Sequence, residues 1–538
     1  TMDKIKQRDF LQLHGIEIPR GIVVPSAQIR TFAQHQAEFL QQLADQQIAF
    51  PVIVKPHQEG SSLGVSLVHR PADLAAAVLL AGTIYPQRQQ AVLIEEKMMG
   101  MEFSAIVLED WATGAPVALP PTEIEVEAQT GFFDYEQKYM PGRALKHTPA
   151  RCSAAELALI QATCIKVKTA LAIQTIARID GFLTPDHRVV IIDPNTLSGM
   201  SPATFLFLQA AEIGMSHTQL INHLIYTDLK QKNLLGQLLM TADQLLNPTS
   251  TNTAPAKISV AVLFGGDSNE REISLESGRN VIYKLAPQKY NVLPLFVDQN
   301  CELYRLSHKL LVRNKTTEIA ALVTPADRVP WADLPRLVDF VFIALHGGKG
   351  ENGAVQGALE MLGLPYNGSG VFTSALCMDK FKTNQLLQQH GLAVPRHYYL
   401  TRTAWQTDPQ QALTAIEIQL ALPLIVKPAN DGCSVLVQKV NSLAELTIAL
   451  ETMLATKDHA FIEECIVGTE LTIGVIGNQQ PQALPPSQTV VAKDILSLAE
   501  KFLPGAGENL TPAPLPLTAL TLAQQTVTAA YQIVGGAG

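Results

Sequence analysis

The stretch that decides the fold is "FPVIVKP", residues 50–56, because the chain repeats it as "LPLIVKP" at residues 422–428. Each copy is an apolar run that ends in Lys-Pro, which predicts a buried strand followed by a turn. Further motifs recur in the same order, at spacings that shrink from 376 to 363 residues: "MDK" at 2–4 and 378–380, "LIEEKMMGME" at 93–102 and "FIEECIVGTE" at 461–470, "ALPP" at 118–121 and 483–486, and "DYEQKYMPG" at 134–142 and "SLAEKFLPG" at 497–505. The shared order indicates a repeat unit of about 370 residues.

The chain holds less than one and a half of these units, and neither copy is whole. We call the copy that begins at the amino end the first repeat and the copy that begins at residue 257 the second repeat. The second ends in "AAYQIVGGAG", where the first continues into a further motif at 177–200. We expect the chain to be a window from a longer tandem protein, in which a domain like 257–370 precedes the first repeat.

Apolar runs alternate with amphipathic segments, which predicts a fold of the α/β and α+β classes. The stretch "KISVAVLFGGDSNEREISLESG" at 257–278 indicates a strand, a glycine turn and a helix of a doubly wound α/β domain, with Asp267 and Glu270 as a helix capping box. "NPTSTNTAPA" at 247–256 is typical of a linker. The predicted parts are 1–92, 93–228, the linker 229–256, 257–370, 371–460 and 461–538.

The composition excludes several classes of protein. The 538 residues are 47% hydrophobic and 17% charged, with a formal net charge of -9, which disfavours nucleic acid and anionic membranes as partners. No apolar run approaches the roughly 20 residues that cross a bilayer. The six cysteines are scattered without a CxxC pair, which argues against a zinc site or a disulfide framework and favours the cytoplasm.

Three glycine-rich stretches follow predicted strands: "KPHQEGSSLGV" at 55–65, "GGDSNEREISLESG" at 265–278 and "LHGGKGENGAVQG" at 345–357. Backbone N–H groups in such turns can bind phosphate oxygens, and Lys55 adds a positive charge. The spacing differs from that of a Walker loop. A plain hairpin turn, a solvated helix start and a structural role for His346 remain the alternatives for the three stretches.

The sharpest chemical signal is "ARIDGFL" followed by "VVIIDPNTLSGM", at residues 177–200. Asp180, Asp193 and Asn195 supply oxygen ligands from two adjacent predicted strands, which suits a Mg²⁺ ion that carries nucleotide phosphate. Arg178 lies nearby and could stabilise a developing anion. The alternative is that the acids are solvated strand ends, although an unpaired acid among such apolar residues would be costly to bury.

Together and in this order, these motifs closely resemble those of the D-alanine–D-alanine ligases, enzymes of the ATP-grasp fold that serve peptidoglycan precursor synthesis. The resemblance covers almost the whole chain except the linker. It implies central and C-terminal domains that hold ATP between them, and an N-terminal α/β domain at 257–370. It also implies ligation of two D-alanine substrates through an acyl phosphate.

The resemblance implies a role for each motif residue. ATP would be bound by a set from both repeats: Lys4, Lys55, Gly60, Ser61, Ser62, Glu95, Glu102 and Lys138, with Lys380, Lys427, Glu463 and Glu470. Mg²⁺, with Mn²⁺ as the alternative ion, would be held by Asp180, Asp193 and Asn195. The catalytic residues would be Arg178, Ser61, Tyr139, Glu272 and Gly199. The D-alanines would contact Glu272, His346, Thr204 and Phe205.

The sequence also departs from the family pattern. Asp193 stands where the family commonly has Glu, and Phe205 stands where a smaller apolar residue is usual. In the second repeat, Cys433 and Phe502 replace Ser61 and Tyr139. Two other functions therefore stay open, namely a non-catalytic nucleotide-binding tandem module and an ATP-grasp ligase with a different amino acid acceptor. Whether the chain forms a homo-oligomer, and whether 257–370 serves the first repeat, also stay open.

Overall fold

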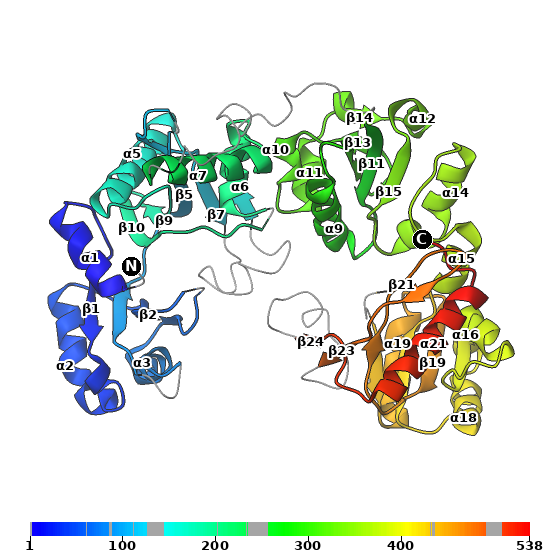
Figure 1. Ribbon diagram of the computed structural model, residues 1–538. Helices are drawn as coiled ribbons and strands as arrows, with labels where there is room; N and C mark the ends of the chain where they lie inside the picture. Colours follow the sequence, from blue (N-terminus) through cyan, green and yellow to red (C-terminus); the bar gives the residue numbers. More distant parts are fainter. Residues whose placement is uncertain are drawn as a thin grey trace. The chain divides into compact units, whose positions relative to one another are not determined.

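The computed structural model describes residues 3–60, 62–84, 89–110, 112–125, 145–201, 203–232, 234, 257–430, 432, 436–490 and 508–538 (Figure 1). The chain divides into two compact units. The first unit comprises Thr1–Ala254 and Ser307–Leu322, and the second comprises Pro255–Leu306 and Val323–Gly538. Among the described residues, none of the helices has both the length and the apolar character that a membrane crossing requires.

A four-stranded antiparallel sheet opens the first unit, in the order β1-β4-β2-β3. Its elements are β1 (Gly21–Val24), β2 (Val52–Pro56), β3 (Ser66–Val68), β4 (Val92–Glu96), α2 (Phe32–Asp45) and α3 (Leu74–Gly82). Alternate residues of β2, Val52 and Val54, are buried in a core with residues of both helices. Because side chains alternate along a strand, Lys55 emerges on the face opposite this core.

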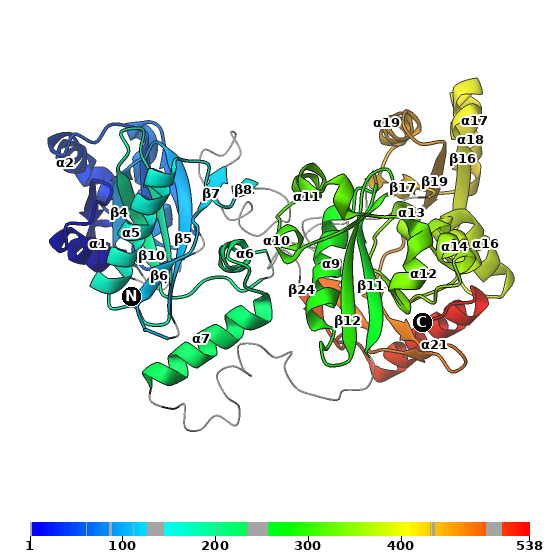
Figure 2. The ribbon, with the colours of Figure 1, turned by 90° about the horizontal axis from the view of Figure 1, so that it is seen from above.

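The second sheet of the first unit has the order β10-β9-β5-β7-β8, with β6 beside β5. Its strands are β5 (Met101–Glu109), β6 (Pro116–Ala118), β7 (Thr122–Glu125), β8 (Leu145–His147), β9 (Ile176–Leu183) and β10 (Val189–Asn195). Helix α5 (Ala154–Ala170) lies across one face, where it covers Phe103 and Val107 (Figure 2). Helices α6 (Phe205–Glu212) and α7 (His217–Gln231) cover Ile106 and Leu108 on the other, and α1 (Lys4–Leu13) precedes the first sheet.

Residues 307–322 lie in the predicted 257–370 part of the sequence, but they pack in the first unit. They form α10 (His308–Leu311) and α11 (Thr316–Leu322). Val312 packs against Leu208 and Ala211 of α6. The buried carboxylate of Glu212 accepts from Arg313 at 2.7 Å and pairs with Lys309 at 2.6 Å. A buried carboxylate is tolerated when it is paired in this way, so the two cations fix this segment on α6.

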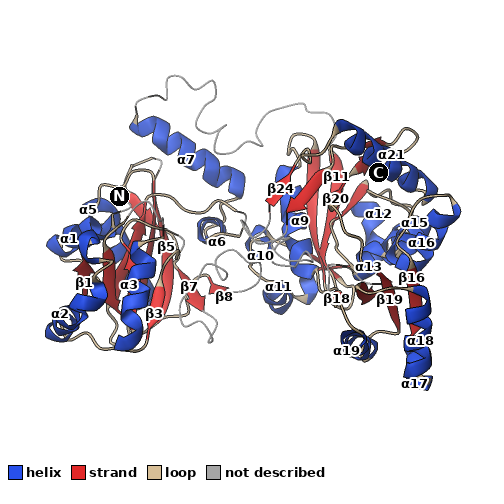
Figure 3. Ribbon diagram, turned by 90° about the horizontal axis from the view of Figure 1, so that it is seen from below, coloured by secondary structure: helices blue, strands red, loops and turns tan. Residues whose placement is uncertain are grey.

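The second unit begins with a sheet in the order β14-β13-β12-β11-β15, in which β12, β11 and β15 are parallel. Its strands are β11 (Ile258–Gly265), β12 (Tyr290–Val297), β13 (Leu303–Arg305), β14 (Arg328–Val329) and β15 (Phe340–Ile343). The helices are α9 (Arg271–Lys284), α12 (Leu334–Leu337), α13 (Gly348–Glu351) and α14 (Ala354–Met361). Helix α9 lies against β11, where Gly278 meets Phe264, and α12 lies on the other face (Figure 3). Helices α12 and α14 share a core with Leu263 on that face. The helices thus cover both faces, as a doubly wound unit requires.

The second unit also contains a copy of the first unit's opening sheet, with the order β16-β19-β17-β18. Its elements are α15 (Val371–Met378), α16 (Lys380–Gln389), β16 (His397–Thr401), α17 (Arg402–Thr407), α18 (Pro409–Gln419), β17 (Leu424–Pro428), β18 (Gln438–Val440), α19 (Leu443–Leu454) and β19 (His459–Glu464). The end of the chain forms β20 (Leu471–Thr472), β21 (Val475–Ile476), β22 (Gln482–Ala483), β23 (Ser487–Val490), β24 (Glu508–Leu510) and α21 (Leu517–Ile533). The repeated sequence therefore folds with repeated topology, and the α/β and α+β prediction is confirmed.

Candidate nucleotide and metal site

A buried charge cluster lies on the face of the first sheet opposite the core formed with α2 and α3. The Lys55 Nζ is 2.5 Å from one carboxylate oxygen of Glu95, and Arg8 of α1 donates to the other oxygen. Arg8 also donates to the Pro19 carbonyl at 2.8 Å. The structure thus joins two predicted nucleotide residues and adds Arg8, which the sequence analysis missed. The sequence could have indicated Arg8, because it lies four residues after Lys4 and therefore on the same side of a helix.

Lys4 links the two sheets of the first unit. Asp3 caps α1 and accepts from the backbone N–H groups of Ile5 and Lys6. The Lys4 Nζ donates to the Glu59 carbonyl at 2.9 Å and lies 3.6 Å from an Asp193 carboxylate oxygen. Lys4 therefore holds the start of the glycine-rich stretch close to the end of β10.

The predicted metal ligands meet where β9 pairs with β10. Asp180 lies opposite Asp193 and Arg178 lies opposite Asn195, after a register shift between Ile191 and Asp193. Such an irregularity re-aims the side chains that follow it. The Asp180 carboxylate accepts from Ser104 at 2.7 Å, from Arg178 at 3.1 Å and from the Asn195 amide at 3.3 Å. Ser104 is a further residue that the sequence analysis missed.

These residues fit a Mg²⁺ ion in the chemistry of their donors. Two carboxylates and an amide offer the hard oxygen ligands that Mg²⁺ takes, and Mg²⁺ commonly completes its shell with water and substrate phosphate. Within the described ranges, no group of three or more His, Cys, Asp or Glu side chains could hold a metal. The third protein ligand here would therefore be the amide oxygen of Asn195.

Gly199, Thr204 and Phe205 come together at the start of α6. Thr204 is the residue before the first turn, and its hydroxyl donates to the Gly199 carbonyl at 2.7 Å. A Cβ on Gly199 would lie only 3.2 Å from the Thr204 methyl, so the two residues are closely packed. The Lys146 Nζ lies 5.3 Å from the centre of the Phe205 ring, within range of a cation–π contact.

The remaining first-repeat residues are only partly covered. Ser61, Lys138 and Tyr139 lie outside the described residues, while Gly60 and Ser62 flank the glycine-rich turn. Ser62 adopts a positive φ of 58°. Glu102 is at the start of β5, opposite Phe182 of β9.

The two predicted substrate residues of 257–370 lie in the second unit. The ring Nε2 of His346 is 2.7 Å from the Ser277 hydroxyl, and the residue lines a small cavity of about 20 Å³ beside Asp267. Glu272 is in the first turn of α9, with a carboxylate oxygen 3.8 Å from the Arg271 Nε.

The capping-box prediction is wrong. Helix α9 begins at Arg271, and Glu270 precedes it without a side-chain cap. Asp267 instead pairs with Lys349 at 2.8 Å, and the Ser268 hydroxyl accepts from the Glu270 N–H. The turn between β11 and α9 is longer than a capping box allows, because Gly347, with its left-handed backbone, brings the 346–348 loop against Ser268 and Glu270.

Glu270, which the sequence analysis assigned only to the capping box, has a neighbour that the analysis missed. Gly432, in the glycine-rich stretch of the second repeat, is so close to it that an added Cβ would lie 3.1 Å from a Glu270 carboxylate oxygen. Within the second unit, an acid of the 257–370 part therefore faces the second repeat's own loop. Only its place inside the α9 motif could have signalled this.

The second repeat retains the lysine–glutamate pair of the first. The Lys427 Nζ pairs with Glu463 and lies 5.6 Å from the centre of the Phe461 ring. The Lys380 backbone N–H donates to the Ala429 carbonyl at 3.1 Å, as Lys4 does to His57 at 2.9 Å. Glu470 is exposed just before β20, and Cys433 and Phe502 lie outside the described residues.

Comparison with known proteins agrees with this double arrangement. The family model described as "D-ala D-ala ligase C-terminus" matches residues 10–226 and 386–538, and "D-ala D-ala ligase N-terminus" matches residues 259–369. The repeat is thus a repeat of the family's C-terminal region.

Curated relatives carry the same family name. D-alanine–D-alanine ligases of Natranaerobius thermophilus and Geobacillus kaustophilus are each 32% identical, over 52% of this chain and 79% and 80% of theirs. That of Chlorobaculum tepidum is 34% identical, over 48% of this chain and 76% of its own. Among solved structures, the VanG D-Ala:D-Ser ligase of Enterococcus faecalis is 26% identical, with a TM-score of 0.46, and covers 52% of this chain and 84% of its own. The matches to both family models and to the three curated relatives show that the chain belongs to the D-alanine–D-alanine ligase family.

Proposed function

We propose that this chain ligates two D-alanines to D-alanyl-D-alanine with ATP, for peptidoglycan precursor synthesis in the cytoplasm. The observation that carries the proposal is the Lys4 contact set. One ammonium group reaches the backbone beside the glycine-rich turn and the carboxylate of Asp193. The Asp193 backbone lies opposite that of Asp180 in the paired strands β10 and β9. This arrangement supports a site in which phosphate and a metal ion lie between the two sheets of the first unit.

The proposed chemistry has two steps. A carboxylate oxygen of the first D-alanine bonds to the γ-phosphorus of ATP, and the bond to the bridging oxygen of ADP breaks. The amine of the second D-alanine then attacks the acyl carbon, phosphate leaves and the amine loses a proton. The protein contributes mainly by positioning the reactants and balancing charge.

Each residue of the first repeat takes a defined part in this proposal. Lys4 and Lys55 neutralise phosphate charge, with the turn at 60–62 and Lys138. Mg²⁺, or Mn²⁺, held by Asp180, Asp193 and Asn195 would supply further neutralisation of the transferring phosphoryl group. Arg178 and the backbone N–H of Gly199 face the tetrahedral intermediate.

The substrate roles in this proposal follow the family resemblance. Glu272 and His346 orient the first D-alanine, and Ser61 and Tyr139 are the further catalytic residues. Thr204 and Phe205 border the second D-alanine. Glu95 and Glu102 in the first repeat, with Glu463 and Glu470 in the second, belong to the adenine and ribose ends of the two nucleotide sites, where Lys380 and Lys427 contact phosphate.

The test is phosphate release from ATP that depends on D-alanine, measured with the full chain. Asp180→Asn keeps the shape of the side chain but removes its charge, so we expect kcat to fall by roughly 100-fold or more. Glu17→Gln is the matched control, because Glu17 forms a half-exposed ion pair with Arg188 at the surface of the same unit. Full turnover by Asp180→Asn would contradict the metal assignment.

Two further outcomes address the alternatives. ATP binding without any D-alanine-dependent phosphate release by the unmodified chain would contradict the ligase proposal and support a non-catalytic nucleotide module. Faster release with D-serine than with D-alanine as the second substrate would support a different acceptor, which the large Phe205 side chain at the start of α6 would then have to accommodate.

A further inference from the structure

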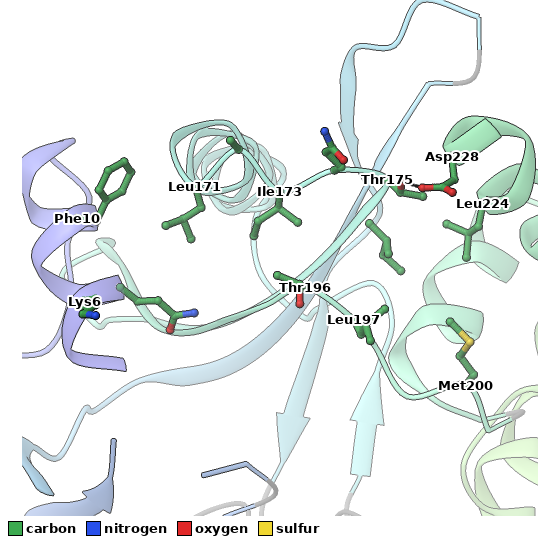
Figure 4. Close-up of a pocket in the computed structure, with 14 residues that line it drawn as sticks. Lys6, Phe10, Leu171, Ile173, Thr175, Thr196, Leu197, Met200, Leu224 and Asp228 are labelled. Atoms are coloured by element: carbon green, nitrogen blue, oxygen red, sulfur yellow. Dashed lines mark hydrogen bonds between the residues drawn. The ribbon is translucent and has the colours of Figure 1, made fainter. Parts of the chain in front are cut away.

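A cavity of about 730 Å³ opens in the first unit (Figure 4). Its lining comes from four segments: Lys6, Gln7 and Phe10 of α1, residues 171–176 after α5, Thr196, Leu197 and Met200 after β10, and Leu224 and Asp228 of α7. Phe10, Leu197 and Met200 are 41%, 67% and 51% exposed. Apolar surface of this extent in a concave site is typical of a place that binds a further apolar segment.

The second repeat has a counterpart for two of these segments, residue by residue. Helices α5 and α21 both have 17 residues and start and end 363 positions apart. The turns after them match as well, since Ile173 N–H donates to the Lys168 carbonyl as Gly536 N–H does to that of Tyr531. Likewise α1 and α16 both have ten residues and follow a capping aspartate, 376 positions apart.

In the second unit, that counterpart is occupied by α15 and the turn ahead of it. The Thr373 hydroxyl of α15 bonds with the carbonyls of Val534 and Gly535 at 2.8 and 2.9 Å. The Ser369 hydroxyl accepts from the Ala537 N–H at 3.0 Å.

The same helix also contacts α16. The Thr383 hydroxyl of α16 donates to the Leu376 carbonyl at 2.7 Å. Four residues of the second unit therefore receive α15 and its turn: Thr383, Val534, Gly535 and Ala537.

Every one of these four has its equivalent in the wall of the cavity. The offset of 376 relates Thr383 to Gln7, and the offset of 363 relates the other three to Leu171, Ala172 and Gln174. All four first-repeat residues line the cavity. Ala172 even has the left-handed backbone of its counterpart Gly535, with φ of 49° against 73°. The backbone is thus already shaped as it is where α15 is bound.

We propose that this cavity is the seat of a helix of the α15 type that leads into α1, as α15 leads into α16. The occupant presents a Gly-Ser turn and then a short helix, whose threonine hydroxyl bonds to the carbonyls of Leu171 and Ala172. Its apolar side chains cover Phe10, Leu197 and Met200. The binding surface is formed by α1, the turn after α5 and the segment after β10.

The test grafts the α15 sequence ahead of the first repeat in the full chain. Residues 368–377, with serine in place of Cys377, replace Thr1, so that they run into Met2 as the original runs into Met378. Linkage gives the grafted segment a high effective concentration. We expect amide hydrogen exchange in residues 171–176 and 196–200 to slow by about tenfold or more.

Two matched variants make the result specific. A graft with valine at the position of Thr373 lacks the hydroxyl and should lose most of the added protection, and a scrambled graft should give none. Gln174→Trp, which fills the cavity from its exposed rim, should abolish protection by the intact graft, whereas Gln174→Ala should not. Equal protection by the intact and scrambled grafts would overturn the proposal, as would no protection by either. Protection by a free peptide of residues 368–377, but not by the graft, would overturn the link into α1.

Discussion

Glu95 in the first repeat and Glu463 in the second hold the same place in the sequence motif and in the sheet, yet their surroundings differ. Glu95 is paired with both Lys55 and Arg8, and its side chain is 4% exposed. Glu463 is paired with Lys427, and its side chain is 12% exposed. The position equivalent to Arg8 is Asn384 in the second repeat. A motif on two strands therefore fixes the lysine–glutamate pair, whereas the preceding helix decides how completely the pair is enclosed.

The largest expected effect comes from neutralising the two glutamates in turn. Glu95→Gln leaves two enclosed cations without their carboxylate, so we expect the free energy of opening β2 and β4 to fall by about 3 kcal/mol. Glu463→Gln leaves a single, partly exposed lysine, and β17 and β19 should lose about 1 kcal/mol. Hydrogen exchange of the four strands measures both free energies of opening in the 538-residue chain.

The loss of stability should therefore be larger for Glu95→Gln than for Glu463→Gln. Equal losses in both repeats would show that Arg8 adds nothing to the enclosure of Glu95. A larger loss in the second repeat would reverse the comparison. Glu17→Gln, at the surface of the first unit, provides the baseline for a carboxylate change without burial.

A smaller effect should follow from exchanging the helix residue itself. Arg8→Asn removes a charge-assisted hydrogen bond but leaves Lys55 on Glu95, so β2 and β4 should lose about 1.5 kcal/mol. Asn384→Arg should stabilise β17 and β19 by less, because the arginine side chain must be ordered in a more open site. Hydrogen exchange measures the stability of both strand pairs. If Asn384→Arg does not stabilise β17 and β19, then residue 384 on α16 is not placed as Arg8 is on α1.

The features that local sequence could predict are those set by strand alternation and motif order. The apolar run at 50–56 predicted a buried strand, and β2 buries Val52 and Val54 while Lys55 faces away. The adjacent strands that carry Asp180 and Asp193 do pair, as expected. These features depend on residues close together along the chain, where the period of side chains is fixed by the backbone.

The features that the sequence could not predict depend on packing between distant segments. Arg8 reaches Glu95 only because α1 packs against the second sheet through Leu11. Residues 307–322 join the first unit because Glu212, about 100 positions earlier, is buried and needs their cations. The predicted capping box failed for a similar reason, since the 346–348 loop recruits the turn before α9.

The smallest expected effect concerns the starts of the equivalent helices α5 and α21. Helix α5 has a capping box in which Ser153 and Glu156 bond to each other's backbone, whereas α21 begins after Pro516 with no side-chain cap. Ser153→Ala removes a cap, so the first unit should unfold about 2 °C lower. Pro516→Ser with Ala519→Glu would install the same box in α21 and should raise the stability of the second unit.

The pH dependence distinguishes the capping box from a general effect of Ser153. The hydrogen bonds from the Ser153 side chain and backbone, followed by that to His187, lower the pKa of Glu156 from 4.5 to about 2. A carboxyl whose folded pKa is lowered contributes stability above its unfolded pKa and loses that contribution as the pH falls through the folded pKa. The difference in unfolding temperature between the unmodified chain and Ser153→Ala should therefore be full above pH 5 and shrink steadily towards pH 2. Helix α21 has Ala519 at the position of Glu156. The change in unfolding temperature caused by Pro516→Ser alone should therefore not depend on pH in this range, whereas that of the double variant should. A pH-independent difference in α5 would mean that Ser153 acts without Glu156, and the contrast between the two helix starts would then rest on the serine alone.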